Sequence, residues 1–211
     1  MNTALAATAL ACILFPFAHQ GTRLAEPQQE FVLQANGKEC ELRIGLPTEL
    51  PKEFAGQKVT LRVRPTRLFD YQGLRFRYPQ SYHWEYEAKE SGGQFVTLAG
   101  HTNVLQLSVY NDRVEPGSLV DSMARAIAAQ MGTKTETSAC ELAGKDKRVL
   151  KGQRLALTVA GQKSTQEVYA VRLGDEVVAL VVQDTCGEDG KPDPETTRLL
   201  DLLADSLEWP K

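Results

Sequence analysis

The stretch YQGLRFRYPQSYHWEYEAK, residues 71–89, decides the fold, because its side chains alternate in character along two short segments. In the first segment, Leu74, Phe76 and Tyr78 fall on one side of an extended chain and arginines fall on the other. In the second, HWEYEA, the aromatic residues share a side, and His83 shares the opposite side with two glutamates. Such alternation is typical of half-buried antiparallel strands. The stretch therefore predicts neighbouring strands with an apolar and a polar side.

The alternation continues on both sides of this stretch. Further strands are predicted in KVTLRVRP, QFVTLAG, NVLQLSVY, RLALTVA, EVYAVRL and EVVALVVQ. Residues 31–64 include two short apolar runs around Asn36-Gly37, a dipeptide that favours a tight hairpin turn. This segment predicts an additional N-terminal hairpin, which can be part of the same sheet.

Two segments change to a helical period. GSLVDSMARAIAAQMG repeats apolar residues at helical spacing, with Ser118 as the predicted cap and Gly132 as the predicted end. DPETTRLLDLLADSLEW carries a leucine stripe, with Asp193 as its cap and Pro194 at its first position. The order of strands, helix, strands and helix predicts an α+β fold, in which helices cover an antiparallel β-sheet.

Composition and the first residues predict the compartment. The 211-residue chain has a net charge of −3 and a pI of about 5.7, which disfavours a nucleic-acid partner. Residues 1–18 are uncharged and mostly apolar, and are shorter than a typical membrane span. They predict a signal peptide, followed by a polar linker over residues 19–30, although retention as an anchor is an alternative. We expect a periplasmic or extracellular protein with no membrane span after leader removal.

Several motifs together resemble the PsbP-like superfamily, which includes envelope proteins of the DcrB type. The motifs are YQGLRFRYPQSYHWEYE, GSLVDSMARAIAAQM, KGQRLALTV and LLADSLEW. The resemblance assigns residues 65–211 to a PsbP-like domain and implies an α/β/α sandwich. It implies a binding or accessory role toward an unknown protein partner, because members mostly bind other proteins or assemblies. No catalytic residue is carried over, and no cofactor is expected.

The cysteines leave two alternatives open. Removal of the leader leaves Cys40, Cys140 and Cys186, which lack C-x-x-C spacing, so zinc clusters and thioredoxin-like motifs are unsupported. Either two of the thiols pair in an oxidising compartment, or all three are buried and separate. A Cys140–Cys186 disulfide is the first expectation, because Cys40 lies outside the region that resembles the family.

Four arginines form the candidate partner or anion patch, at positions where pairs share one strand face. They are Arg62, Arg64, Arg75 and Arg77. The alternative interpretation is a solvated ladder, in which Glu85 and Glu87 on the next strand pair with the arginines.

His83, His101 and Glu85 are the candidate metal ligands. The turn after residue 89 returns the chain beside HWEYEA, so both histidines are expected near one end of the hairpin. Two imidazoles and one carboxylate can hold a transition metal. The alternative is two exposed histidines beside a loop, with Trp84 anchored in the core.

The leading functional hypothesis is an exported, non-enzymatic binding or accessory protein. The alternatives are a metal-binding protein or metal-assisted hydrolase that uses His83 and His101, and a purely structural envelope protein.

Overall fold

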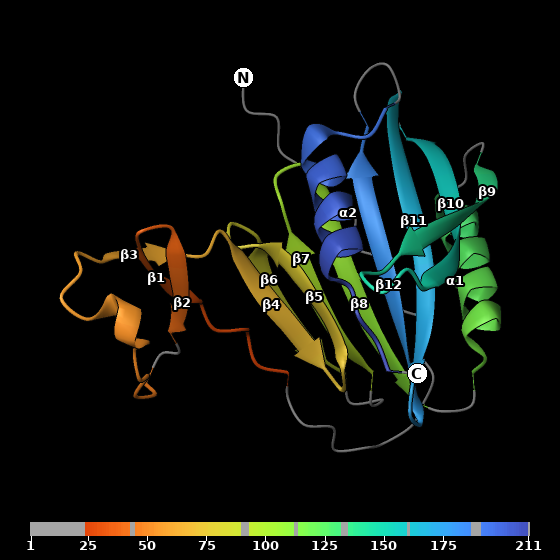
Figure 1. Ribbon diagram of the computed structural model, residues 1–211. Helices are drawn as coiled ribbons and strands as arrows, with labels where there is room; N and C mark the ends of the chain where they lie inside the picture. Colours follow the sequence, from red (N-terminus) through yellow and green to blue (C-terminus); the bar gives the residue numbers. More distant parts are fainter. Residues whose placement is uncertain are drawn as a thin grey trace.

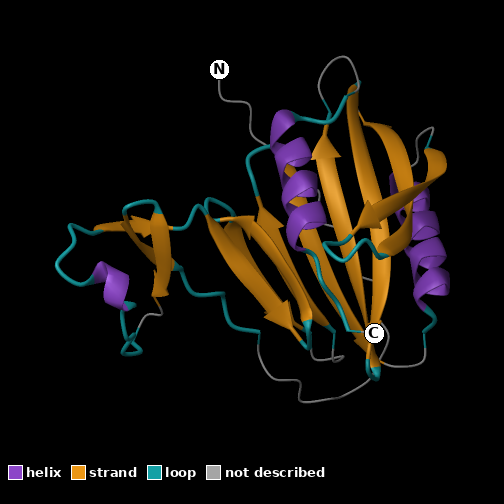
Figure 2. Cartoon of the chain, in the orientation of Figure 1, coloured by secondary structure: helices purple, strands orange, loops and turns teal. Residues whose placement is uncertain are grey.

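The computed structural model is an α+β protein, and antiparallel strands dominate it (Figures 1 and 2). It describes residues 24–42, 45–89, 93–111, 114–131, 135–159, 161–186 and 191–210. The predicted signal peptide, residues 1–18, and the predicted helix end at Gly132 lie outside these ranges. No helix within them is long and apolar enough to cross a membrane.

Over the described residues, a seven-stranded antiparallel sheet forms the body of the molecule, in the order β6-β7-β8-β12-β11-β10-β9. Its strands are β6 (His83–Ala88), β7 (Gln94–Ala99), β8 (Asn103–Asn111), β9 (Glu136–Ala143), β10 (Val149–Val159), β11 (Gln162–Leu173) and β12 (Glu176–Thr185). The long strand β12 lies between β8 and β11, so it is shielded by a neighbour on either side.

Side chains of β12 alternate between two separate cores on the two faces of the sheet. Val177, Ala179 and Val181 pack in a cluster with residues of α1 (Pro116–Met131). Val178, Leu180 and Val182 pack in the other cluster with leucines of α2 (Pro194–Ser206). The two helices therefore cover opposite faces of the sheet (Figure 1).

The helix starts test two predictions. Asp193 caps α2, because its carboxylate accepts the N–H of Glu195 at 2.8 Å, and Pro194 occupies the first position as predicted. The predicted cap at Ser118 is wrong. Helix α1 begins at Pro116, whose fixed φ suits a first helical position, so Ser118 already lies inside the first turn.

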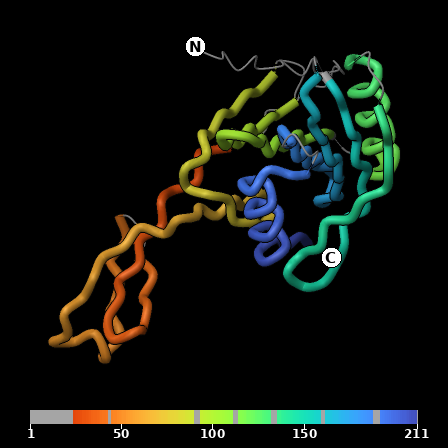
Figure 3. The backbone as a smooth tube through the Cα atoms, turned by 90° about the horizontal axis from the view of Figure 1, so that it is seen from above, coloured from red at the N-terminus to blue at the C-terminus, as the bar shows by residue number. Residues whose placement is uncertain are grey.

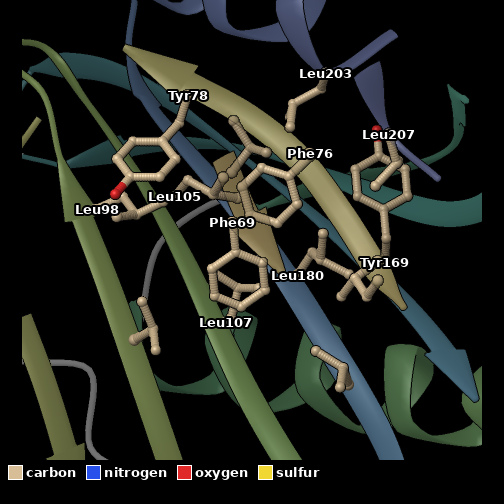
Figure 4. Packing of buried hydrophobic residues seen from close by; sticks show 14 of the residues in the cluster. Phe69, Phe76, Tyr78, Leu98, Leu105, Leu107, Tyr169, Leu180, Leu203 and Leu207 are labelled. Atoms are coloured by element: carbon tan, nitrogen blue, oxygen red, sulfur yellow. The ribbon is translucent and has the colours of Figure 1, made fainter. Parts of the chain in front are cut away.

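A hairpin of β4 (Thr66–Tyr71) and β5 (Leu74–Pro79) lies on the α2 side of the sheet (Figure 1). Phe69 and Phe76 stack with their ring centroids 4.7 Å apart, and Figure 4 shows the Phe76 ring near Leu203 of α2 and near Leu207, which follows that helix. The prediction that β5 pairs with β6 is wrong. Gln72 and Gly73 both have positive φ, so a tight turn pairs β5 with β4 instead.

The N-terminal segment forms its own sheet rather than extending the main one. Among the described residues this sheet has three strands in the order β2-β1-β3: β1 (Phe31–Ala35), β2 (Lys38–Leu42) and β3 (Thr60–Val63). The predicted turn is confirmed, since Asn36 and Gly37 have φ of 50° and 76°. A short 3-10 helix, η1 (Lys52–Phe54), lies between β2 and β3. Figures 1 and 3 show this N-terminal sheet projecting from the body.

Candidate functional site

The N-terminal sheet has one apolar face. The register places Leu33 opposite Cys40 on β2 and opposite Leu61 on β3. One step along, Phe31 lies opposite Leu42 and Val63 in the same way. Because directly opposite residues point to the same side of a sheet, these side chains share a face.

This region also contains most of the exposed large apolar side chains. Among the described residues, five of the six lie between positions 46 and 63: Leu46, Leu50, Val59, Leu61 and Val63. Leu61 is 58% exposed, whereas most apolar residues of the main sheet lie in the two cores. The sixth is Val149, which lies on β10. Clustered apolar exposure of this kind marks interaction surfaces.

The four predicted arginines do not form a common patch. Arg77 donates to the Glu30 carboxylate at 2.8 Å, and Arg64 forms an ion pair with the same carboxylate at 3.1 Å. Glu30 thereby connects the start of the N-terminal sheet to β5. Arg75 pairs with Asp70 at 3.0 Å on the neighbouring strand β4. Arg62 is exposed on β3.

The predicted ladder of these arginines with Glu85 and Glu87 is wrong. Strand β6, which carries the glutamates, pairs with β7, and β5 pairs only with β4 within the described sheets. The acids that meet the arginines come from β4, β2 and the segment before β1, which are closer in the folded chain.

His83 and Glu85 lie on the exposed side of β6, as the alternation predicts. His83 Nε2 is 3.4 Å from Glu85 Oε1, and their side chains are 72% and 66% exposed. Trp84, on the other side, packs against the α2-side core with its ring centroid 6.2 Å from that of Phe69.

His101 follows β7 and lies at the same end of the β6–β7 hairpin as His83, since His83 is opposite Ala99. Its backbone N–H donates to Glu195 Oε2 at 2.9 Å, and the next N–H, of Thr102, donates to the same oxygen at 2.8 Å. The His101 backbone thus helps attach the β7–β8 turn to α2. No group of three His, Cys, Asp or Glu side chains within the described ranges is placed to hold a metal ion.

The predicted Cys140–Cys186 disulfide is wrong, because both thiols are free in the structure. Cys140 on β9 lies opposite Gly152 on β10, and Gly152 lies opposite Tyr169 on β11. Tyr169 in turn lies opposite Leu180 on β12, and Cys186 comes directly after that strand. Three strand spacings of about 4.8 Å separate β9 from β12. A disulfide requires Cα atoms within about 7 Å, so these two residues cannot be bridged.

We expect the thiols to differ in reactivity. Burial raises the pKa of the Cys186 thiol, and burial also raises that of Cys140. In the folded protein at pH 8, iodoacetamide should therefore label Cys186 at least about tenfold more slowly than Cys40. Peptide mass spectrometry after timed labelling measures these rates, with the unfolded chain as the control. Equal rates in the folded state, or a disulfide-linked Cys140–Cys186 peptide, would contradict the structure.

Two buried carboxylates, Glu167 of β11 and Asp184 of β12, have polar partners that the sequence did not reveal. Glu167 accepts hydrogen bonds from the Tyr169 hydroxyl at 2.6 Å and from Arg154 Nε at 2.7 Å. Asp184 accepts from the Thr196 hydroxyl, also at 2.6 Å. A cavity of about 80 Å³ lies among these groups, which is large enough for water. Glu167 pairs with Arg154, and Asp184 accepts a hydrogen bond from Thr196 of α2, so the Asp184–Thr196 contact is best explained as an anchor for that helix.

A wider hollow, of about 450 Å³, lies beside the C-terminal residues. The Arg148 guanidinium covers the Trp209 ring at 4.4 Å from its centroid and also pairs with Asp146. Lys145 pairs with Glu208 at 2.8 Å. These contacts satisfy the charges in the hollow and hold the C-terminal segment against the β9–β10 turn.

Comparisons with known proteins do not add a family to this description. No family model matches the chain, and no curated protein matches it.

Proposed function

We propose that this chain is an exported, non-enzymatic binding or accessory protein of the PsbP-like type, and that the N-terminal sheet is its docking surface. The observation that carries the proposal is the concentration of exposed large apolar side chains between residues 46 and 63. Monomeric soluble proteins rarely leave such residues clustered, because each buried apolar side chain contributes about 1.5–3 kcal/mol. A protein partner that covers this sheet would recover that energy.

The other parts of the proposal rest on the sequence. The uncharged apolar residues 1–18 support export, and the four motifs that resemble the PsbP-like superfamily support the family type. An antiparallel sheet with helices on opposite faces is compatible with an α/β/α sandwich. Fold type alone does not specify a partner, so the docking surface is the part that needs a direct test.

The test is a paired charge substitution. We expect the double variant Leu61→Lys, Val63→Lys to bind its envelope partner at least about tenfold more weakly, because two ammonium groups would have to be desolvated at the interface. The partner is first identified by affinity capture with the chain from residue 19 and is then purified, and the Kd is measured by calorimetry.

Val149→Lys is the matched control, since Val149 is 43% exposed like Val63 at 42% but lies on the main sheet. Its Kd should equal that of the unmodified chain. Full affinity in the double variant, or an equal loss in the control, would refute the docking surface.

A further inference from the structure

The outer edge of β3 has backbone groups that point away from the sheet at Leu61 and Val63. The N–H of Arg64 donates to the Glu30 carbonyl at 2.9 Å, and the register places Leu61 opposite Leu33. In an antiparallel pair, residues that exchange hydrogen bonds alternate with residues that do not. The even-numbered residues of β3 therefore bond to β1, and the N–H and C=O groups of Leu61 and Val63 face outward.

The opposite edge of the N-terminal sheet is different. Ala35 and Lys38 close the two-residue hairpin and so form a bonded pair. The outward backbone groups of β2 therefore belong to Glu39 and Glu41, which are both exposed. Charged side chains at such positions are a common protection against unwanted strand pairing. The β3 edge carries leucine and valine at the equivalent positions, and its exposed charges are the basic side chains of Lys58 and Arg62.

The side chains of β3 specify the chemistry of an added strand. Leu61 and Val63 would extend the apolar face of the sheet, so the partner residues opposite them should be apolar. Arg62 points to the other face and is exposed, so an acidic residue opposite it would be favoured. Lys58, four residues earlier, is also exposed and increases the positive charge of this edge.

We infer that the β3 edge binds an extended strand of a partner protein in which apolar residues alternate with acidic ones. The inference rests on the proposed docking surface and names how the partner binds there. Backbone hydrogen bonds to Leu61 and Val63 supply affinity, and the alternating side chains supply selectivity.

A second copy of this chain fits the edge less well. A symmetric antiparallel pairing centred on Leu61 places Lys58 opposite Arg64 of the other copy. A shift of one register step in one direction places Arg62 opposite Lys58 of the other copy. A shift in the other direction places Arg62 opposite Arg62 of the other copy. Like charges directly opposite each other destabilise a sheet, so each of these registers is unfavourable.

Two synthetic peptides test the inference, one in which valine alternates with glutamate and one in which valine alternates with lysine. The probe for binding is fluorescence anisotropy with the chain from residue 19. We expect at least about tenfold tighter binding of the glutamate peptide, and the reverse preference for Arg62→Glu. Amide hydrogen exchange should slow at Leu61 and Val63 and stay unchanged at Glu39 and Glu41.

Proline substitutions compare the two edges directly. Leu61→Pro removes an outward N–H of β3, and Glu39→Pro removes an outward N–H of β2, so neither breaks a bond to β1. We expect Leu61→Pro to weaken glutamate-peptide binding at least about tenfold and Glu39→Pro to leave it unchanged. Leu61→Ala separates the loss of the side chain from the loss of the N–H. Circular dichroism confirms that each variant is folded.

Equal binding of the two peptides, an unchanged preference in Arg62→Glu, or protection at Glu39 and Glu41 would overturn the inference. So would a dimer, observed by sedimentation without peptide, whose Leu61 and Val63 amides are already protected. If the double lysine variant loses its natural partner but neither peptide slows exchange at Leu61 and Val63, the docking surface stands and strand addition is refuted.

Discussion

Replacement of Phe76 by alanine is expected to lower the free energy of unfolding by about 3–5 kcal/mol, the usual cost of removing a buried aromatic ring. Phe76 is 0% exposed, and its ring stacks on that of Phe69 between the main sheet and α2. Figure 4 shows it among Leu203, Leu207 and Tyr169, so the surrounding residues cannot easily close the cavity. Denaturant unfolding followed by circular dichroism measures the change.

Val149→Ala serves as the control for Phe76→Ala, because Val149 is exposed and its replacement should change stability by no more than about 0.5 kcal/mol. A cost below about 1 kcal/mol for Phe76→Ala would show that the β4–β5 hairpin is not packed on the sheet as described.

Gly152→Ala is the second large effect. Gly152 lies on β10 opposite Tyr169 of β11, and a Cβ there would sit 2.4 Å from the Val168 carbonyl oxygen and 2.5 Å from the Tyr169 ring. Backbone and a buried ring cannot both move away cheaply, so we expect a loss of about 3 kcal/mol or more. The midpoint of denaturant unfolding reports it.

Gly117→Ala makes the identical chemical change without the clash. Apart from its chain neighbours and the backbone of its own helix, nothing described lies within 4 Å of a Cβ at Gly117, which is in the first turn of α1. The substitution should stabilise the protein by about 0.4–1 kcal/mol, because alanine loses less chain entropy on folding. Changes of the same sign and size in both variants would rule out the packing described for β10.

Local sequence patterns predicted the elements well because their causes are local. The alternation in residues 74–78 produces a strand with a buried side, since Leu74, Phe76 and Tyr78 are all buried. Asn36-Gly37 forms its turn, and Asp193 caps its helix by accepting a hydrogen bond from the N–H of Glu195 in the first turn. Each of these outcomes depends on residues only a few positions apart.

Strand pairing and the candidate sites were less predictable because they depend on distant residues. The turn at Gln72-Gly73 lacks the usual Asn-Gly signal, so β4 was not recognised and β5 was assigned the wrong neighbour. Asp184 looks like a surface acid at the end of β12, yet it is 1% exposed beneath Thr196 of α2. The spacing of Cys140 and Cys186 along the sequence does not indicate that strands β10 and β11 lie between them.

The same limit applies to the apolar face of the N-terminal sheet. KVTLRVRP alternates as a half-buried strand should, and this pattern predicts that Leu61 and Val63 are covered. In the structure they are exposed on an edge strand. Strand β3 thus has the alternation of a half-buried strand, but among the described residues its apolar side stays exposed. We expect this of a surface that a partner protein covers.

Strand β12 makes the two cores of the body one cooperative unit. Its odd-numbered residues from 177 to 181 belong to one cluster and its even-numbered residues from 178 to 182 to the other. Deletion of a single residue within β12 would turn the side chains beyond the deletion to the opposite face of the sheet. Both cores would then lose their packing together. The body should therefore unfold in a single transition. Val32, Ala35 and Phe54 are buried but belong to neither cluster, so we expect the N-terminal sheet to unfold and refold while the body stays folded.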